Sequence, residues 1–136
     1  MQSSDVLERD GAGTYARAKT RALIALATIS FVVPMIEVAV TGHAAPYGKF
    51  AITQMLLFAP ATYYWYHSDK SERFYRASAV LNVGIIFAPY LAFPYYFLRT
   101  RGWRRGALSI AKGIAALVAL GLIDGAGEAV GLVFAR

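Results

Sequence analysis

The chain has 136 residues, of which 57% are hydrophobic and 16% are charged, and its mean hydropathy is +0.45. Soluble domains carry about 25% charged residues, so the composition argues against a soluble protein and favours an integral membrane protein. The absence of cysteine excludes disulfides and thiolate metal sites. The net charge of +6 comes mostly from basic residues beside apolar blocks. There we expect them to meet lipid phosphate and not nucleic acid.

Four apolar blocks come near the roughly 20 residues that a helix needs to cross about 30 Å of hydrocarbon. Short links make neighbouring helices pack antiparallel, so we predict an all-α, polytopic membrane bundle with four transmembrane spans and short loops. Residues 1–21 are predicted to form a polar N-terminal tail, and residues 22–136 the four-helix transmembrane domain. The predicted spans cover residues 22–40, 50–66, 77–98 and 107–134.

The first block follows several basic residues, as the apolar part of a signal peptide does. It is longer than such a segment and contains Glu37, so a retained span is the better interpretation. Proline removes a backbone donor and kinks a helix. Pro34 in the first block, Pro60 in the second, and Pro89 and Pro94 in the third therefore predict kinks.

The link at residues 67–73 is predicted to be a turn that restarts a helix, because Asp69 and Glu72 have the spacing of a capping box. Aromatic clusters at residues 63–66 and 94–97 end the second and third blocks, as in interfacial belts. In an up-and-down bundle the two clusters would lie on opposite membrane faces. This arrangement favours a third block that crosses fully.

Basic residues favour an orientation with the N-terminus inside. In the four-span bundle, the cytoplasmic segments would carry more basic residues than the outer loops. The dense cluster at residues 99–105 would then lie outside. An alternative topology, with a re-entrant segment around Pro89 and Pro94, keeps the basic loops inside. Both topologies make the chain a multi-pass membrane protein.

The central third of the chain carries WYHSDKSERFYR at residues 65–76, LN at 81–82 and PYYFLRTRG at 94–102. This pattern, a Trp-Tyr…Asp…Arg turn followed by a Pro-Tyr-Tyr…Arg-x-Arg-Gly exit, resembles a group of small bacterial integral membrane proteins. The resemblance implies a place in the bacterial inner membrane and implies no particular activity.

No catalytic or metal-binding signature stands out in the sequence. His43 and His67 flank the second block at opposite faces, so they would not share one metal or haem within a bundle, and neither has metal-ligand spacing. An interfacial turn explains His67 and Asp69 more simply than an acid–base pair does. We therefore expect no enzyme activity, no cofactor and no metal site.

The basic exit RTRGWRR between the third and fourth blocks has two overlapping interpretations. Long basic side chains anchor spans by snorkelling to the interface, and clustered arginines also bind anionic lipid headgroups. Either interpretation makes membrane lipids the expected partner. The residues concerned are Arg99, Arg101, Trp103, Arg104 and Arg105.

Charged groups inside spans are costly, at roughly 2.5–3.5 kcal/mol each at a helix centre, and are candidates for a functional site. Glu37, Asp124 and Glu128 are the acidic candidates, whereas Gln54 and Asn82 are expected to make interhelical hydrogen bonds. An alternative ends the last span near residue 123 and leaves the two later acids in water.

The last block is rich in glycine at helical spacing. Asp124 and Glu128 are four residues apart and share a helix face with Gly121 and Gly125. Spaced glycines let a neighbouring backbone approach closely, so we predict helix packing there. The predicted packing residues are Gly121, Gly125, Gly127 and Gly131.

Two functions follow as expectations. The first is an accessory or scaffold subunit of a membrane complex, which associates with another membrane protein or with itself. The second is a small oligomeric ion- or proton-coupled transporter or channel that uses the intramembrane carboxylates. Neither involves nucleic acid.

Overall fold

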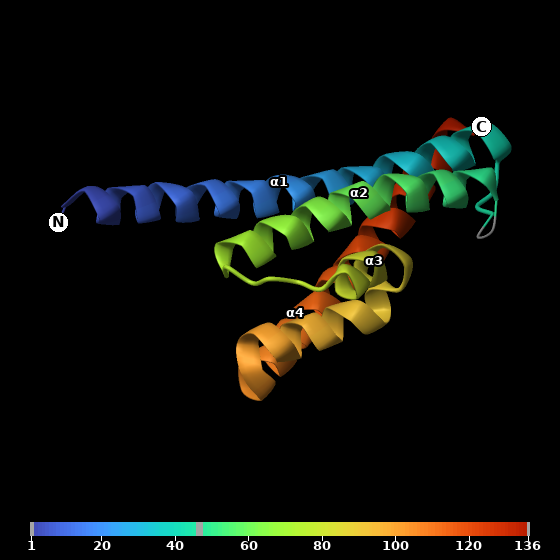
Figure 1. The fold of residues 1–136 in the computed structure, drawn as a ribbon. Helices are drawn as coiled ribbons and strands as arrows, with labels where there is room; N and C mark the ends of the chain where they lie inside the picture. Colours follow the sequence, from blue (N-terminus) through green and yellow to red (C-terminus); the bar gives the residue numbers. More distant parts are fainter. Residues whose placement is uncertain (1, 46–47, 136) are drawn as a thin grey trace. The chain divides into compact units, whose positions relative to one another are not determined.

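The protein is all-α, as predicted. The computed structural model describes residues 2–45 and 48–135, and the side chains of 13–45 and 48–135. Within the described chain there are four helices and no strand (Figure 1). The helices are α1 Gln2–Thr41, α2 Lys49–Glu72, α3 Ala79–Phe87 and α4 Pro89–Phe134.

Two of the described helices are long and apolar enough to cross a membrane, by length and composition alone. They are α1, from Gly13 to Thr41, and α4, from Pro89 to Phe134. The prediction of four spans is not confirmed. The polar tail expected at residues 1–21 is also helical from Gln2 onward and continuous with the rest of α1.

The helix ends have identifiable local causes. Gly42 follows α1 with a φ of 75°, and its N–H donates to the Val38 carbonyl, as in a left-handed C-terminal cap. The side chain of Ser78 caps α3 by accepting from the Leu81 N–H. Ala88 separates α3 from α4 because a residue before proline disfavours the helical conformation.

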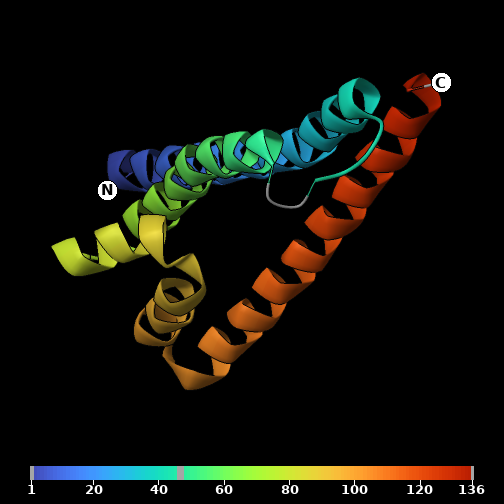
Figure 2. The ribbon, with the colours of Figure 1, turned by 90° about the vertical axis from the view of Figure 1, so that its right-hand side faces the viewer.

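The chain reverses sharply inside α4, at Gly102 (Figure 2). Gly102 has a φ of 72° and a ψ of 171°, a conformation that glycine adopts at no steric cost. On either side of this turn the chain packs tightly, since a Cβ at Gly106 would lie 2.8 Å from the Phe97 carbonyl oxygen. Pro34, Pro60 and Pro94 lie inside helices.

The contacts divide the chain into two compact units. Unit 1 consists of Met1–Leu23 and Thr62–Ile110, and unit 2 of Ile24–Ala61 and Ala111–Arg136. This grouping differs from a tail followed by one transmembrane domain, because α1, α2 and α4 each contribute residues to both units.

Unit 1 has an aromatic core. Tyr66 and Tyr96 are fully buried, and their ring centroids lie 5.0 Å apart. Trp65 contacts Phe93 and Phe97 with centroid distances of 5.9 and 6.1 Å. The expectation that the aromatic clusters at 63–66 and 94–97 lie on opposite faces is therefore wrong: they form one core.

The third predicted span is not one continuous helix. It is divided at Ala88 between α3 and the first part of α4. Asn82, near the start of α3, accepts hydrogen bonds from Tyr66 and Lys70 of α2 at 3.1 and 3.2 Å. Arg101, at the end of the first part of α4, also contacts α2 through its ion pair with Asp69. Both ends of this segment therefore lie beside the same end of α2.

Unit 2 is held by close packing of α1 against α4. A Cβ at Gly127 would lie 2.3 Å from the Phe31 carbonyl oxygen, and one at Gly131 would lie 2.6 Å from the Met35 carbonyl oxygen. Gly121 and Gly125 have open space where a Cβ would stand. Of the four glycines expected to pack, only the later pair therefore does so within unit 2.

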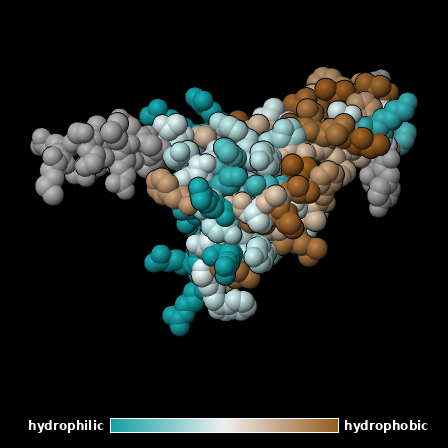
Figure 3. Space-filling view, viewed as in Figure 1, coloured by the Kyte–Doolittle hydropathy of each residue, from teal (hydrophilic) through white to brown (hydrophobic). Residues whose placement is uncertain are grey.

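Large apolar side chains remain exposed on every helix of unit 2. Figure 3 shows brown, hydrophobic surface over the C-terminal half of α1 and the N-terminal half of α2. Such extensive apolar exposure is unusual for a soluble monomer and is expected of a surface that faces lipid. Examples are Ile24, Val40, Ile52, Met55, Leu56, Leu122 and Val133.

Candidate functional site

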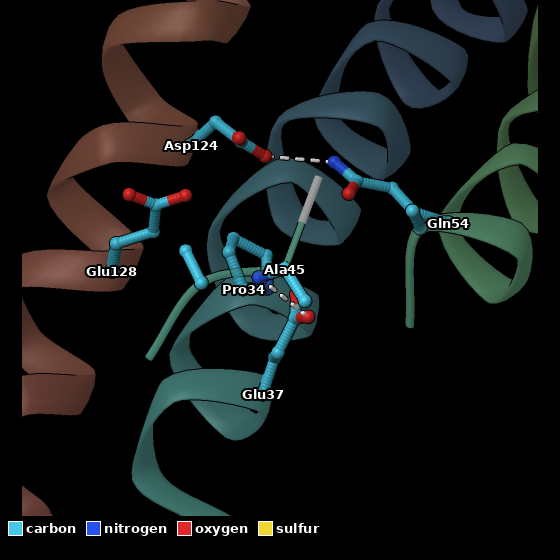
Figure 4. A pocket seen from close by; sticks show the side chains of 8 residues that line it. Pro34, Glu37, Ala45, Gln54, Asp124 and Glu128 are labelled. Atoms are coloured by element: carbon cyan, nitrogen blue, oxygen red, sulfur yellow. Dashed lines mark hydrogen bonds between the residues drawn. The ribbon is translucent and has the colours of Figure 1, made fainter. Parts of the chain in front are cut away.

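The three predicted intramembrane acids line one cavity of unit 2. This open cavity has a volume of about 430 Å³. Figure 4 shows the side chains of Glu37 from α1, Gln54 from α2, and Asp124 and Glu128 from α4 around the same space. Its remaining lining consists of Pro34, Ala44, Ala45 and Ala51.

Backbone and amide groups orient two of the three acids. Glu37 is only 7% exposed, and its Oε1 accepts a hydrogen bond from the Ala45 N–H at 3.1 Å. Asp124 accepts one from the Gln54 Nε2 at 2.7 Å. The predicted interhelical role of Gln54 is thus realised with one of the candidate acids.

The cavity is acidic and lacks a compensating cation among its described lining residues. Lys112, a basic residue of the same helix as Asp124 and Glu128, is exposed and does not line it. The described residues contain no group of three or more His, Asp or Glu side chains arranged to hold a metal ion. Exchange of a proton, or loose attraction of a cation, suits this arrangement better than a tight metal site does.

Local sequence explains how the helices bring the acids together. The i, i+4 spacing sets Asp124 and Glu128 on one face of α4. Gly127 and Gly131 let α4 approach the α1 backbone near Glu37. The cap at Gly42 then turns the chain so that Ala45 meets that carboxylate. The acids therefore meet because the close helix contact lies beside them.

The predicted basic cluster is split by the structure. Arg99, Arg104 and Arg105 are exposed, and Trp103 is 78% exposed. Arg101 instead turns inward: its Nη2 lies 3.0 and 2.9 Å from the two carboxylate oxygens of Asp69. It therefore serves the interior of unit 1, whereas the other four residues remain available at the surface.

Comparison with known proteins yields a negative finding. No protein-family model, curated protein or solved structure matches the chain.

A second polar cluster, centred on Asp69, holds unit 1 together. Asp69 is 1% exposed and forms ion pairs with Arg101, Arg73 and Lys19. The Tyr96 hydroxyl donates to it at 2.9 Å. Lys19 also pairs with Glu72. One carboxylate therefore connects α1, α2 and the turn in α4.

Arg101 completes this cluster. Its Nη1 donates to the Ser109 hydroxyl at 2.6 Å, and its guanidinium lies 4.8 Å from the centre of the Phe97 ring. Because Ser109 follows the Gly102 turn, Arg101 spans the turn and fixes its two sides. The Arg101 Nε is buried and has no hydrogen-bond partner within the described residues.

The pKa of Asp69 reflects two opposing effects. Burial raises it, but the hydrogen bond and charge of Arg101, the hydroxyl of Tyr96 and the charge of Arg73 together lower it below the ordinary value of 3.8. Asp69 is therefore a charged anchor at neutral pH.

Sequence reasoning missed the importance of Asp69. The expected turn and helix cap at 67–73 are wrong, because α2 continues through Glu72 and buries Asp69 on its inner side. The residue pattern itself carried a signal: Trp65 packs against the aromatic core, and Asp69, Tyr96 and Arg101 form the ion cluster of unit 1. Their contacts cross 27 to 32 positions of sequence.

Proposed function

We propose that the chain is a multi-pass inner-membrane protein with three crossings and one re-entrant hairpin. The crossings are by α1, by the part of α4 that follows Gly102, and by residues 50–66 of α2, a stretch that is shorter and less apolar than the other two. At 1.5 Å per residue, α3 is about 14 Å long and Pro89–Arg101 about 20 Å, so neither reaches across about 30 Å of hydrocarbon. The return of both ends of this segment to α2 supports a hairpin that enters and leaves at one face.

Within this membrane protein, the cavity of unit 2 binds and releases a proton or small cation, as in a small ion- or proton-coupled transporter. The single observation that carries this proposal is the convergence of Glu37, Asp124 and Glu128 on one space that has no base among its described lining residues. Acids in a membrane protein face a cavity or a partner because exposure to lipid is costly. A volume of about 430 Å³ also falls within the usual range of ligand pockets.

Flux through reconstituted vesicles tests the proposal. The protein is placed in proteoliposomes that contain a pH-sensitive dye, and a potassium diffusion potential is imposed with valinomycin. Proton movement is followed with and without external tetraethylammonium, a small organic cation used as the probe. We expect the wild type to move protons several-fold faster than the triple variant Glu37→Gln, Asp124→Asn, Glu128→Gln in at least one condition.

Lys112→Gln is the matched control, because this exposed charge lies on α4 outside the cavity. It should retain the wild-type flux. If the triple variant inserts normally and its flux equals that of the wild type in both conditions, the cavity is not a proton or cation site.

An accessory or scaffold subunit is the second candidate, favoured by the open space at Gly121 and Gly125. Glycines at this spacing would admit a helix of another protein or of a second copy. Purification in mild detergent discriminates between the candidates. A fixed large partner supports the accessory subunit, whereas an oligomer of this chain alone supports the transporter.

A further inference from the structure

Positive charge is concentrated in unit 1. By sequence, unit 1 contains eleven basic and five acidic residues, whereas unit 2 contains three of each. The net charge of +6 therefore belongs entirely to unit 1. In Figure 3, hydrophilic side chains shown in teal project from the described part of this unit.

The internal contacts of unit 1 account for only part of this charge. Lys19, Arg73 and Arg101 form the ion pairs with Asp69 and Glu72. Lys70 contacts Asn82 and the Tyr66 ring. The side chains of six exposed arginines make no ion pair or hydrogen bond within the described chain. They are Arg17, Arg21, Arg76, Arg99, Arg104 and Arg105.

The Asp69 cluster brings the segments that carry these arginines together. Lys19 lies between Arg17 and Arg21 on α1, and Arg73 lies one turn before Arg76. Arg101 lies between Arg99 and Arg104 at the turn in α4. Lys19, Arg73 and Arg101 all pair with Asp69. Trp103, next to Gly102 in that turn, presents an exposed indole. Six cations and an aromatic side chain are thus held on one unit by a common anchor.

We propose that these arginines and Trp103 form a docking surface for anionic phospholipid headgroups at the cytoplasmic face of the membrane. Arginine presents a planar fork of donors that matches phosphate oxygens, and tryptophan favours the headgroup layer. The positive-inside rule places such a surface in the cytoplasm, where anionic lipid attracts it. This proposal rests on the proposed membrane location but not on the cavity of unit 2.

Lipid retention measured by native mass spectrometry tests the surface. The purified chain is exposed in mild detergent to phosphatidylglycerol or to phosphatidylcholine of the same chain length. We expect the wild type to retain more phosphatidylglycerol, and Arg99→Gln, Arg104→Gln, Arg105→Gln to lose most of this excess. Raising the ionic strength should weaken the excess in the wild type, because salt screens exposed charges.

The control variant Lys49→Gln, Lys112→Gln removes two exposed bases of unit 2 and should keep the excess. Equal retention of the two lipids by the wild type overturns the proposal, as does a triple variant that still prefers phosphatidylglycerol. Binding of a DNA oligonucleotide without any preference for the anionic lipid also overturns it. If the wild type prefers phosphatidylglycerol but moves protons no faster than the variant without the three acids, only the proposed role of the cavity is contradicted.

Discussion

Replacing Asp69 by Asn is expected to lower the free energy of unfolding by about 3 kcal/mol, because loss of one partner of a buried ion pair leaves the other uncompensated. Asp69 is 1% exposed, and its loss leaves Arg101 without a counter-ion. Denaturant titration in detergent, followed by tryptophan fluorescence, measures the change. Trp65 reports on this unit through its contact with Phe97.

Glu72→Gln is the matched control. Glu72 also pairs with Lys19, but its side chain is 32% exposed, and exposed pairs contribute about 0–1 kcal/mol. Equal destabilisation by the two variants would show that Asp69 is not the anchor of unit 1.

The pH dependence of the free energy of unfolding tests the contribution of Asp69 in a second way. The pKa of Asp69 lies below 3.8 in the folded protein, so its contribution is present above that ordinary value. It is lost as pH falls through the folded pKa. The difference in stability between the wild type and Asp69→Asn should therefore be constant near neutrality and shrink only below about pH 4. A difference that shrinks between pH 7 and 5 would contradict the lowered pKa.

Replacing Gly127 by Ala should destabilise unit 2 by about 2 kcal/mol, the usual cost of overpacking a tight contact. The new Cβ would lie 2.3 Å from the Phe31 carbonyl oxygen, so α1 and α4 must separate there. The separation should also disturb the cavity, because Glu128 is the next residue of α4. Unfolding in mixed micelles of increasing denaturing detergent measures the loss.

Gly125→Ala supplies the comparison on the same helix. Apart from its chain neighbours and the adjacent backbone of its own helix, no heavy atom of the described structure would lie within 4 Å of its Cβ. Alanine is a better helix former than glycine by about 1 kcal/mol, so this variant should be neutral or slightly stabilised. Similar losses for both variants would mean that general effects on the helix, and not contact with α1, determine the result.

The sequence predicted the helical class, and it singled out as candidates the three acids that line the cavity. Long apolar blocks have few stable forms other than helices, and the spacing of Asp124 and Glu128 fixes their common face. That Glu37 and Gln54 meet them could not be read from the sequence, because it depends on where α1 and α4 touch. Glycine spacing indicated close packing but did not show which glycines contact α1. Gly127 does and Gly125 does not, because they lie on different faces of α4.

Unit 1 was harder to predict. Tyr66 and Tyr96 are both typical of a membrane interface, and composition alone does not separate two interfaces from one buried core. Asp69 looked like a helix cap because local spacing permits one. Its actual partner, Arg101, is distant in sequence. The break at Ala88 follows from Pro89. Proline can either kink a helix or end it, so the sequence alone did not show that α3 ends there. The segment that contains this break contacts α2.

Topology tests the central claim most directly: the basic segments share one membrane face, and residues 79–101 return to it. The chain has no cysteine, so single cysteines at His43 and Trp103 can be labelled in intact cells with a membrane-impermeant maleimide. With three crossings and a re-entrant hairpin, the cysteine at 43 is labelled from outside, and the one at 103 only after the membrane is opened. Labelling of both positions from the same side would contradict the account, because the third apolar block would then cross the membrane.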